Sequence, residues 1–221
     1  MAVAGDDFTL AHLGEHLGVD ATAVYRHFRT KDELLRSAAD RILSTVTDGL
    51  ETGDGSSTSV QRPWRDQIVE LCERLRAVHL AHPSIAALAS SGPPRGTNEF
   101  VLTEMMLGAL ARAGLLPRAA AQAYHAVIEL TVGAAVIDAP IASAPESSAA
   151  REYERWRDTY RHVDPGSHPH LVAHADELYQ GTADERFRRS LDWLLDGIAA
   201  AAGDQGVRRL AGDATSLEPR S

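Results

Sequence analysis

The sequence predicts an all-α protein, with an N-terminal helix-turn-helix unit followed by a bundle of longer helices. Wherever apolar residues recur regularly, they do so every three or four positions, which is the period of a helix. No run alternates between apolar and polar residues in the manner of a strand. Glycine and proline clusters divide the chain into segments of helical length. With 44% hydrophobic and 24% charged residues, the 221-residue chain is long enough for one or two domains with a real core.

The segment from residue 9 to residue 35 carries the most informative pattern. Its first part predicts a short amphipathic helix, because three leucines recur at i, i+3 and i+7: Leu10, Leu13 and Leu17. Gly18 permits the left-handed turn that ends this helix, and Asp20 can cap the helix that follows. A short helix, a glycine turn and a second short helix together predict a helix-turn-helix.

The second helix of this unit has one apolar face and one exposed face. Val24 and Phe28 are four residues apart, so both can pack back on the leucines of the first helix. The remaining positions then face outward: Thr22, Ala23, Tyr25, Arg26 and His27. This arrangement puts a recognition helix into a DNA major groove, and the sequence therefore predicts a DNA-binding protein.

A third helix is expected to begin at Lys31. Thr30, followed three residues later by Glu33, forms the pattern of a capping box, and Leu34 opens a new apolar stripe. A cation in the first turn opposes the helix macrodipole, yet an ammonium beside exposed amides suits a phosphate oxygen. Lys31 is therefore a candidate phosphate contact.

The formal net charge of −9 is unusual for a DNA-binding protein, because association with phosphate normally needs a positive field. Arg26, Arg29 and Lys31 nevertheless lie together in a stretch, YRHFRTK, that contains no acidic residue. An isolated stretch of this kind is most simply a solvated surface, but behind a helix-turn-helix it favours phosphate contact. We expect modest DNA affinity with a marked salt dependence.

The run from Leu10 to Leu35, LAHLGEHLGVDATAVYRHFRTKDELL, closely resembles the DNA-binding segment of the TetR family of bacterial transcriptional regulators. Its most specific parts are the Tyr25–Phe28 and Lys31–Leu35 pieces. The stretches HPSIAAL and AAAQAYHAVI also resemble the ligand-binding domain of that family. The resemblance implies a repressor that binds a palindromic operator as a homodimer and responds to a small-molecule effector.

In this mechanism the DNA contacts divide into two groups. The exposed N-terminal part of the recognition helix is expected to meet base edges through Thr22, Ala23 and Arg26. Phosphates are expected to be held by Tyr25, His27 and Lys31.

One departure from the family concerns the start of the chain. Family members carry a helix of several turns before this segment, whereas only MAVAGDD precedes Phe8 here. Without that helix, large apolar side chains would lose cover worth roughly 1.5 to 3 kcal/mol each. Two explanations stand open: a natural first helix precedes this start, which is the explanation we favour, or the DNA-binding head is loose and inoperative.

Beyond the third helix, which is expected to run from Lys31 to about Leu50, the sequence predicts further helices separated by proline and glycine breaks. Their expected ranges are 63–83, 85–89, 98–113, 118–139, 151–163 and 184–202. Residues 140–150 are expected to form a mobile loop. We therefore expect a DNA-binding unit with its connecting helix over residues 1–50, a ligand-binding and dimerisation domain over 51–204, and a flexible tail over 205–221.

Two of these helices are candidates for a dimer interface. The helix at 118–139 is apolar on nearly every face, and the helix at 184–202 carries an apolar seam. In the family that the chain resembles, the equivalent helices meet their symmetry mates in a four-helix bundle. The expected interface residues are Val127, Leu191, Leu194, Leu195 and Ile198. The alternative is that both stripes only close the core of the monomer.

Candidate effector contacts lie on the helices that line the pocket in similar proteins. They are mostly apolar with a few polar groups, as a ligand pocket requires: Trp64, His79, Met105, Met106, Tyr124, His125 and Glu129. His125 and Glu129 are four residues apart and form the best polar pair, although they could equally bond each other. Each of the seven has a simpler alternative role in the core.

No feature of the sequence predicts catalysis, a cofactor or a metal. Motifs of serine hydrolases, phosphate-binding loops and zinc proteases are absent from the sequence. His170 and His174 have the i, i+4 spacing of zinc ligands, but an exposed polar helix face explains them as well, and no metal is expected. A second hypothesis therefore remains beside the repressor, a dimeric helical small-molecule-binding protein with an inoperative DNA-binding head.

The single cysteine, Cys72, excludes an intramolecular disulfide. The sequence has neither a signal-peptide pattern at its start nor a run of about eighteen apolar residues free of charge. We therefore expect a cytoplasmic protein without a membrane partner.

Overall fold

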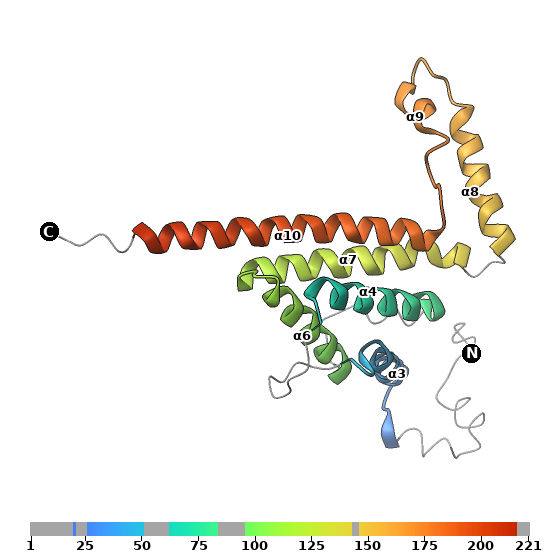
Figure 1. Cartoon of the computed structure of the whole chain (residues 1–221). Helices are drawn as coiled ribbons and strands as arrows, with labels where there is room; N and C mark the ends of the chain where they lie inside the picture. Colours follow the sequence, from blue (N-terminus) through green and yellow to red (C-terminus); the bar gives the residue numbers. More distant parts are fainter. Residues whose placement is uncertain (1–19, 21–25, 51–61, 84–95, 143–145, 216–221) are drawn as a thin grey trace. The chain divides into compact units, whose positions relative to one another are not determined.

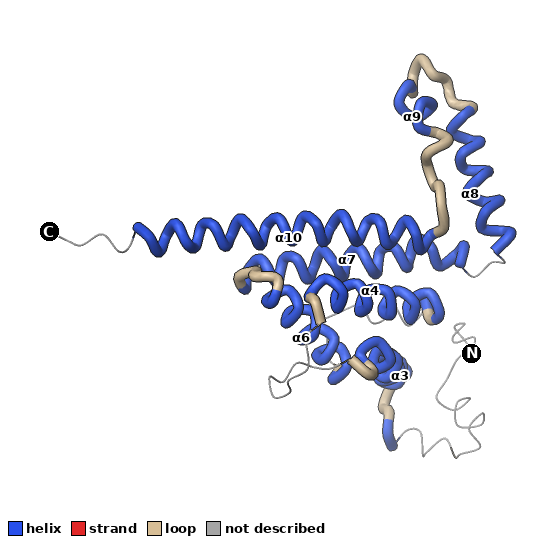
Figure 2. The backbone as a smooth tube through the Cα atoms, in the orientation of Figure 1, coloured by secondary structure: helices blue, strands red, loops and turns tan. Residues whose placement is uncertain are grey.

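The computed structural model describes residues 20, 26–50, 62–83, 96–142 and 146–215. Within these ranges the regular structure is entirely helical, which confirms the all-α prediction (Figure 2). The elements are α3 (Lys31–Thr47), α4 (Trp64–Ala81), α6 (Thr97–Arg112), α7 (Pro117–Ala142), α8 (Glu146–Arg161), α9 (Pro169–His174) and α10 (Ala183–Thr215), as labelled in Figure 1. The helix expected at 85–89 lies outside the described residues.

The predicted helix starts are close to the observed ones, because local signals set them. Lys31 begins α3 behind its Thr30 cap, Pro63 precedes α4, and Gly114 follows α6 with a φ of +96°. A left-handed φ of this kind is available to glycine at no steric cost. Gly49, with a φ of +73°, likewise follows the end of α3.

Three helix ends differ from the sequence prediction. The helix α7 continues through Pro140 to Ala142, and α8 already begins at Glu146, so both enter the segment that we expected to be a loop. Pro140 lies in the last turn of α7, where its missing N–H removes only one hydrogen bond. The helix α10 runs to Thr215 and thus through most of the expected tail, because the alanine-rich stretch after Ile198 has high helix propensity.

The chain forms two compact units, residues 1–108 and 109–221, and the division falls within α6. We expected a boundary near residue 50 instead. That functional division stays a prediction, while the packing of α3 against α4 joins the connecting helix of the head to the first helix beyond it.

In the first unit, α3 and α4 bury their apolar stripes. The buried side chains are Ala39, Leu43 and Val46 of α3, Ile68, Leu71, Cys72 and Leu75 of α4, and Leu102, Met105 and Met106 of α6. Arg74 of α4 closes the end of α3 by donating to the carbonyl oxygens of Val46 and Asp48, at 3.3 and 2.8 Å. These contacts satisfy carbonyls that the last turn of a helix leaves without an internal partner.

A second connection within the first unit joins α3 to the start of α6. Asp40 Oδ1 accepts from the backbone N–H groups of Asn98 and Glu99 at 2.9 and 3.2 Å, and Asp40 Oδ2 accepts from Asn98 Nδ2 at 2.9 Å. Glu99 Oε2 accepts from the Gly96 N–H at 3.0 Å. Asp40 therefore caps a helix other than its own, which no local pattern predicts.

In the second unit, α7 and α10 lie side by side (Figure 1). The seam between them holds buried side chains from both helices, among them Val127, Thr131 and Ala135 of α7 and Phe187, Leu191, Leu195 and Ile198 of α10. The Thr131 hydroxyl donates to the Val127 carbonyl at 2.7 Å, so its polar group is satisfied within the helix.

The helices α8 and α9 form a separate outgrowth of the second unit (Figure 1), and this outgrowth has its own aromatic cluster. Tyr179, in the left-handed conformation at a φ of +57°, stacks on Tyr153 and Tyr160 and meets Trp156 edge-on, with ring centroids 4.9 to 6.3 Å apart. The Arg186 guanidinium lies 4.3 Å from the centre of the Tyr153 ring. This cluster ties α8 to the start of α10.

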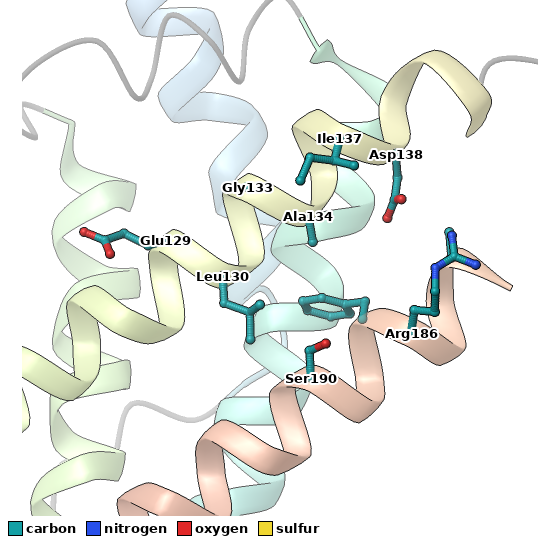
Figure 3. Close-up of a pocket in the computed structure, with 10 residues that line it drawn as sticks. Glu129, Leu130, Gly133, Ala134, Ile137, Asp138, Arg186 and Ser190 are labelled. Atoms are coloured by element: carbon teal, nitrogen blue, oxygen red, sulfur yellow. The ribbon is translucent and has the colours of Figure 1, made fainter. Parts of the chain in front are cut away.

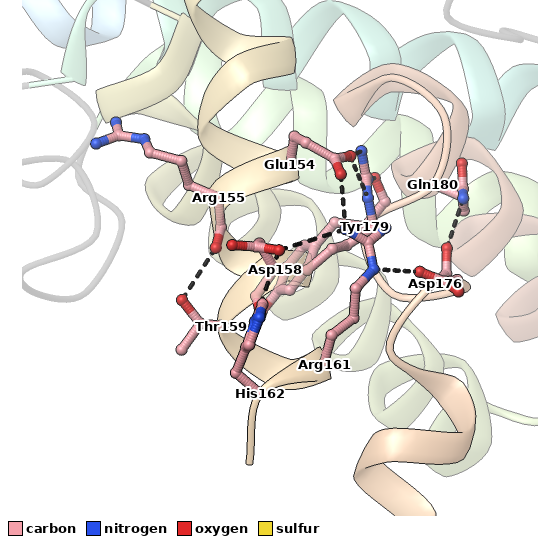
Figure 4. Close-up of polar contacts among 10 residues, drawn as sticks. Glu154, Arg155, Asp158, Thr159, Arg161, His162, Asp176, Tyr179 and Gln180 are labelled. Carbon is pink, nitrogen blue, oxygen red and sulfur yellow. Dashed lines mark hydrogen bonds and ion pairs between the residues drawn. The ribbon is translucent and has the colours of Figure 1, made fainter.

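The same outgrowth carries a network of ion pairs and polar contacts (Figure 4). Arg157 and Arg161 both donate to Glu154, at 2.5 and 2.8 Å, and Arg161 also reaches Asp176 at 2.5 Å. These hydrogen bonds from guanidinium groups hold the pKa of the Glu154 carboxyl below its ordinary value. Because Glu154 and Asp176 are exposed, the network orients the outgrowth more than it stabilises the fold.

Candidate functional site

The described part of the DNA-binding head begins at the end of the expected recognition helix. Arg26 and His27 are helical and exposed, whereas Phe28 is partly buried and its ring centroid lies 6.5 Å from that of His27. This agrees with the predicted division into an apolar and an outward face. Thr22, Ala23 and Tyr25 lie outside the described residues, so their predicted DNA contacts stay predictions.

The start of α3 shows a variant of the predicted capping box. Thr30 Oγ1 accepts from the Glu33 N–H at 3.1 Å, as expected. The Glu33 carboxylate, however, accepts from the N–H of Arg29 at 2.8 Å rather than from that of Thr30. The carboxylate reaches one residue further back, and this contact fixes the turn between the recognition segment and α3.

This turn presents positive charge to solvent. Arg26 and Arg29 are exposed, and Lys31, at the first position of α3, is partly buried and has an interaction partner of its own. Glu33 points its carboxylate to the backbone of the turn, so part of its charge is neutralised locally. Two exposed guanidinium groups beside a helix start suit phosphate oxygens.

The candidate effector residues fall into both units. In the first unit His79, Met105 and Met106 are buried and Trp64 is partly buried. In the second unit Tyr124 is partly buried, while His125 and Glu129 are exposed. His125 packs edge-on against the Tyr124 ring, with centroids 5.4 Å apart. Their role in binding a ligand stays a prediction.

His79 differs from the other six candidates because it is a polar side chain placed in the core. It is 6% exposed, and its Nδ1 has no hydrogen-bond partner among the described residues. Burial lowers the pKa of this imidazole below 6.5, since the charged form loses hydration. A buried neutral ring with an open nitrogen is the kind of group that orients a ligand in an apolar pocket.

The buried imidazole makes stability depend on pH. Below pH 6.5 His79 binds a proton in the unfolded chain but not in the folded chain. The free energy of unfolding therefore decreases as the pH is lowered, until the pH reaches the lower pKa of the folded state. We expect His79→Gln to reduce this slope, which is at most about 1.4 kcal/mol per pH unit. Urea unfolding from about pH 7.5 to about pH 5.5 measures it. The exposed His170 supplies the control, and an equal slope in His79→Gln and His170→Gln would contradict the assignment.

The second unit contains a groove of about 380 Å³ between α7 and α10 (Figure 3). It is lined by Glu129, Leu130, Gly133, Ala134, Ile137 and Asp138 of α7 and by Ala183, Arg186, Phe187 and Ser190 of α10. Of the sequence candidates only Glu129 belongs to it. The remaining residues were missed because their helical spacing shows which face they share but not that the two faces leave a hollow.

Four of the five predicted interface residues are buried within the single chain. Val127, Leu191 and Leu195 are 0% exposed, Ile198 is 7% exposed, and Leu194 is partly buried. A side chain without exposed area has none left to offer a partner. The two helices stay candidates for a dimer interface through different side chains, because Val136 and Ile137 of α7 and Trp193 of α10 are exposed.

The histidines of α9 are the residues whose spacing resembles that of zinc ligands. His170 and His174 are exposed, and His174 Nδ1 lies 2.7 Å from the carbonyl oxygen of His170. In the described part of the chain, no three histidine, cysteine, aspartate or glutamate side chains are grouped so that they could hold a metal ion.

Comparison with family models identifies both parts of the chain. Residues 5–38 match the model described as bacterial regulatory proteins of the tetR family. Residues 59–202, more than half of the chain, match the model described as the tetracyclin repressor-like C-terminal domain. The chain belongs to the TetR family. It is accordingly a helix-turn-helix transcriptional regulator, and the family resemblance seen in the sequence is confirmed.

Curated TetR-family relatives cover most of the chain. A helix-turn-helix transcriptional regulator of Saccharopolyspora erythraea is 31% identical over 198 residues, which cover 88% of this chain and 77% of the relative. A helix-turn-helix transcriptional repressor of Mycobacterium tuberculosis is 30% identical and covers 98% of this chain and 85% of its own length.

Solved structures agree with this membership. Apo ActR from Streptomyces coelicolor is 25% identical, with a TM-score of 0.73, and the match covers 91% of this chain and 89% of ActR. The complex of ActR with (S)-DNPA is also 25% identical, with a TM-score of 0.69 and 90% of each chain covered. ActR is thus a TetR-family protein that has been seen both free and with a small molecule.

Proposed function

We propose that this TetR-family regulator is a repressor that binds a palindromic operator as a homodimer and is controlled by a small-molecule effector. The match of residues 5–38 to the family's DNA-binding model, together with the exposed Arg26 and His27, carries the DNA-binding part. TetR-family regulators bind DNA and small molecules as dimers, which supports the rest. The role is regulatory rather than enzymatic, and its place is the cytoplasm, where the operator DNA is.

The DNA-binding head is proposed to read sequence through one set of residues and to hold phosphates through another. Thr22, Ala23 and Arg26 meet base edges in the major groove. The phosphate contacts are Tyr25, His27 and Lys31. Two heads about 34 Å apart reach successive major-groove faces of a palindrome, so the dimer combines two weak contacts into one specific site.

The effector is proposed to bind beside the predicted pocket residues of the first unit, with His79 as its polar anchor. Met105 and Met106 supply adaptable apolar surface, and the open Nδ1 of His79 supplies one oriented polar contact. The complex of ActR with (S)-DNPA supports control by a small molecule. A ligand that prefers one arrangement of the two heads is sufficient for control.

Two substitutions in the head distinguish residues that contact phosphates from residues that recognise bases. We expect Tyr25→Ala to weaken binding about tenfold on operator and unrelated DNA alike, because a phosphate contact carries no sequence information. Thr22→Ala is expected to change the order of preference among operator variants instead. Fluorescence anisotropy with DNA from the protein's own promoter region, at about 50 and 200 mM salt, measures both.

Arg118→Ala removes an exposed cation from α7, a helix of the second unit, and is the control for a mere change of net charge. If Tyr25→Ala altered sequence preference while Thr22→Ala weakened all sequences equally, the two roles would have to be exchanged. If the wild-type chain bound no sequence specifically, a dimeric ligand-binding protein with an inoperative head would be the better description.

A further inference from the structure

The helix α7 is far more apolar than its surroundings in the single chain require. Over an 18-residue window its mean hydropathy is 1.4, yet only 28% of that window is buried, and it is the one helix in the described ranges with the length and composition to cross a membrane. Val136 and Ile137 on this helix are 58% and 72% exposed. Exposed apolar side chains grouped on one helix in this way mark a surface that another molecule covers.

The groove between α7 and α10 is a hollow in this same surface. Leu130, Ala134 and Phe187 give it apolar walls, and the labelled Ser190 side chain lies within it (Figure 3). Gly133 forms part of its lining, and a Cβ built at Gly133 would meet no atom within 4 Å. Glycine weakens the interior of a helix by about 1 kcal/mol relative to alanine. Among the residues that the structure describes, no contact within the protomer explains why a glycine stands there.

Trp193 lies on the same side of α10 as the groove but outside it. Arg186 and Ser190, which line the groove, precede Trp193 by seven and three residues, so the three share one helical face. Trp193 is 69% exposed and lies six residues beyond Phe187, which is about 9 Å along the helix axis. The Trp193 indole therefore protrudes from α10 beside the groove between α7 and α10.

We propose that Trp193 of each copy inserts into the groove between α7 and α10 of the other copy. A two-fold axis perpendicular to the helices, passing between Trp193 and the groove, brings each protrusion to the partner's hollow. The groove of about 380 Å³ has room for an indole, and the Ser190 hydroxyl offers an acceptor for the indole N–H. The proposal rests on the homodimer of the proposed function and names the contact that holds it together.

The occupant is a second copy because the protrusion and the hollow belong to one surface of one chain. A two-fold interface has to be self-complementary, and this surface offers both halves of the contact. The small side chains at Gly133, Ala134 and Ser190 keep the hollow open, and Gly197, one turn after Trp193, also has no atom within 4 Å of a built Cβ. Small residues on both helices let two helix pairs approach closely.

Sedimentation equilibrium of the full-length chain tests the contact through two substitutions. We expect Trp193→Ala to raise the dimer dissociation constant at least about 30-fold, as for a buried interface tryptophan. Gly133→Leu places a larger side chain at the groove, where its Cβ would meet no described atom within 4 Å, and is expected to have a similar effect. Since both substitutions remove the same contact, the dimer dissociation constant of the double variant is expected to be no higher than the higher of the two single-variant values.

Phe100→Ala is the control, because it removes an exposed aromatic ring, 55% exposed, from α6 rather than from this surface. Additive effects of Trp193→Ala and Gly133→Leu, or no effect of either on a wild-type dimer, would overturn the contact while leaving the dimer of the proposed function intact. A wild-type chain that stays monomeric and binds its operator as a monomer would overturn both. Flotation of the chain with phosphatidylglycerol vesicles would instead assign the apolar face of α7 to a membrane and overturn the proposal.

Discussion

Replacing Leu191 with alanine is expected to lower the free energy of unfolding by about 3 kcal/mol, within the 2 to 5 kcal/mol seen for buried leucines. Leu191 is 0% exposed in the seam where α10 packs on α7, so the substitution removes apolar contacts and leaves a cavity. Urea denaturation followed by circular dichroism measures the loss.

Leu116→Ala is the matched control, because the same chemical change is made at a leucine that is 51% exposed. Its expected cost is within about 0.5 to 1 kcal/mol. We also expect Leu191→Ala to leave the dimer dissociation constant near its wild-type value, since the side chain faces its own protomer. A variant that dissociated into stable, well-folded monomers would place Leu191 at the interface, as its helical spacing first indicated.

The second large effect is expected at Asp40. Asp40→Ala removes the acceptor of three hydrogen bonds, two of them from backbone N–H groups at the start of α6. The first turn of a helix offers no internal acceptor to its N–H groups in general, so the expected loss is about 2 kcal/mol. Asp40→Asn keeps one acceptor oxygen and should lose less, which separates the hydrogen bonds from the packing of the side chain. An unchanged stability of Asp40→Ala would mean that water or Glu99 caps α6 adequately.

Gly96 gives an independent check of the same contact. A Cβ at Gly96 would overlap the Asp40 carboxylate and come within 2.8 Å of the Asp40 Cβ. We therefore expect Gly96→Ala to cost about 1 to 3 kcal/mol in the wild type and clearly less in the Asp40→Ala background, where the overlap with the carboxylate is removed and only the close approach to the Cβ at position 40 remains. Equal costs in the two backgrounds would show that the alanine is tolerated or rejected for a reason other than Asp40.

In the regulation that we propose, this contact lies between the DNA-binding head and the predicted pocket residues of the first unit. The helix α3 starts directly after the recognition segment, and its Asp40 holds the first turn of α6, the helix that carries Met105 and Met106. Displacement of the start of α6 therefore acts on α3 through three hydrogen bonds rather than through loose packing. The stability variants at Asp40 and Gly96 are consequently useful in DNA-binding assays as well.

The sequence by itself determined the family, the fold class and most helix starts. Family membership was legible because the Tyr25–Phe28 and Lys31–Leu35 pieces recur at fixed spacing, and helix starts because a cap such as Thr30 or a glycine such as Gly114 acts on its immediate neighbours. Signals of this kind depend on a few adjacent residues, so no knowledge of the remaining chain is needed to interpret them.

Only the tertiary structure decided what covers each helical face. Periodicity shows that Leu191 and Leu195 share one side of α10, but the same spacing serves a core or a dimer, and the packing of α7 placed both inside the protomer while leaving Trp193 exposed. The Asp40 cap, the open nitrogen of His79 and the groove beside Gly133 likewise join or border segments far apart in the sequence. Such features arise from burial and from contacts across the fold, whose partners no local pattern specifies.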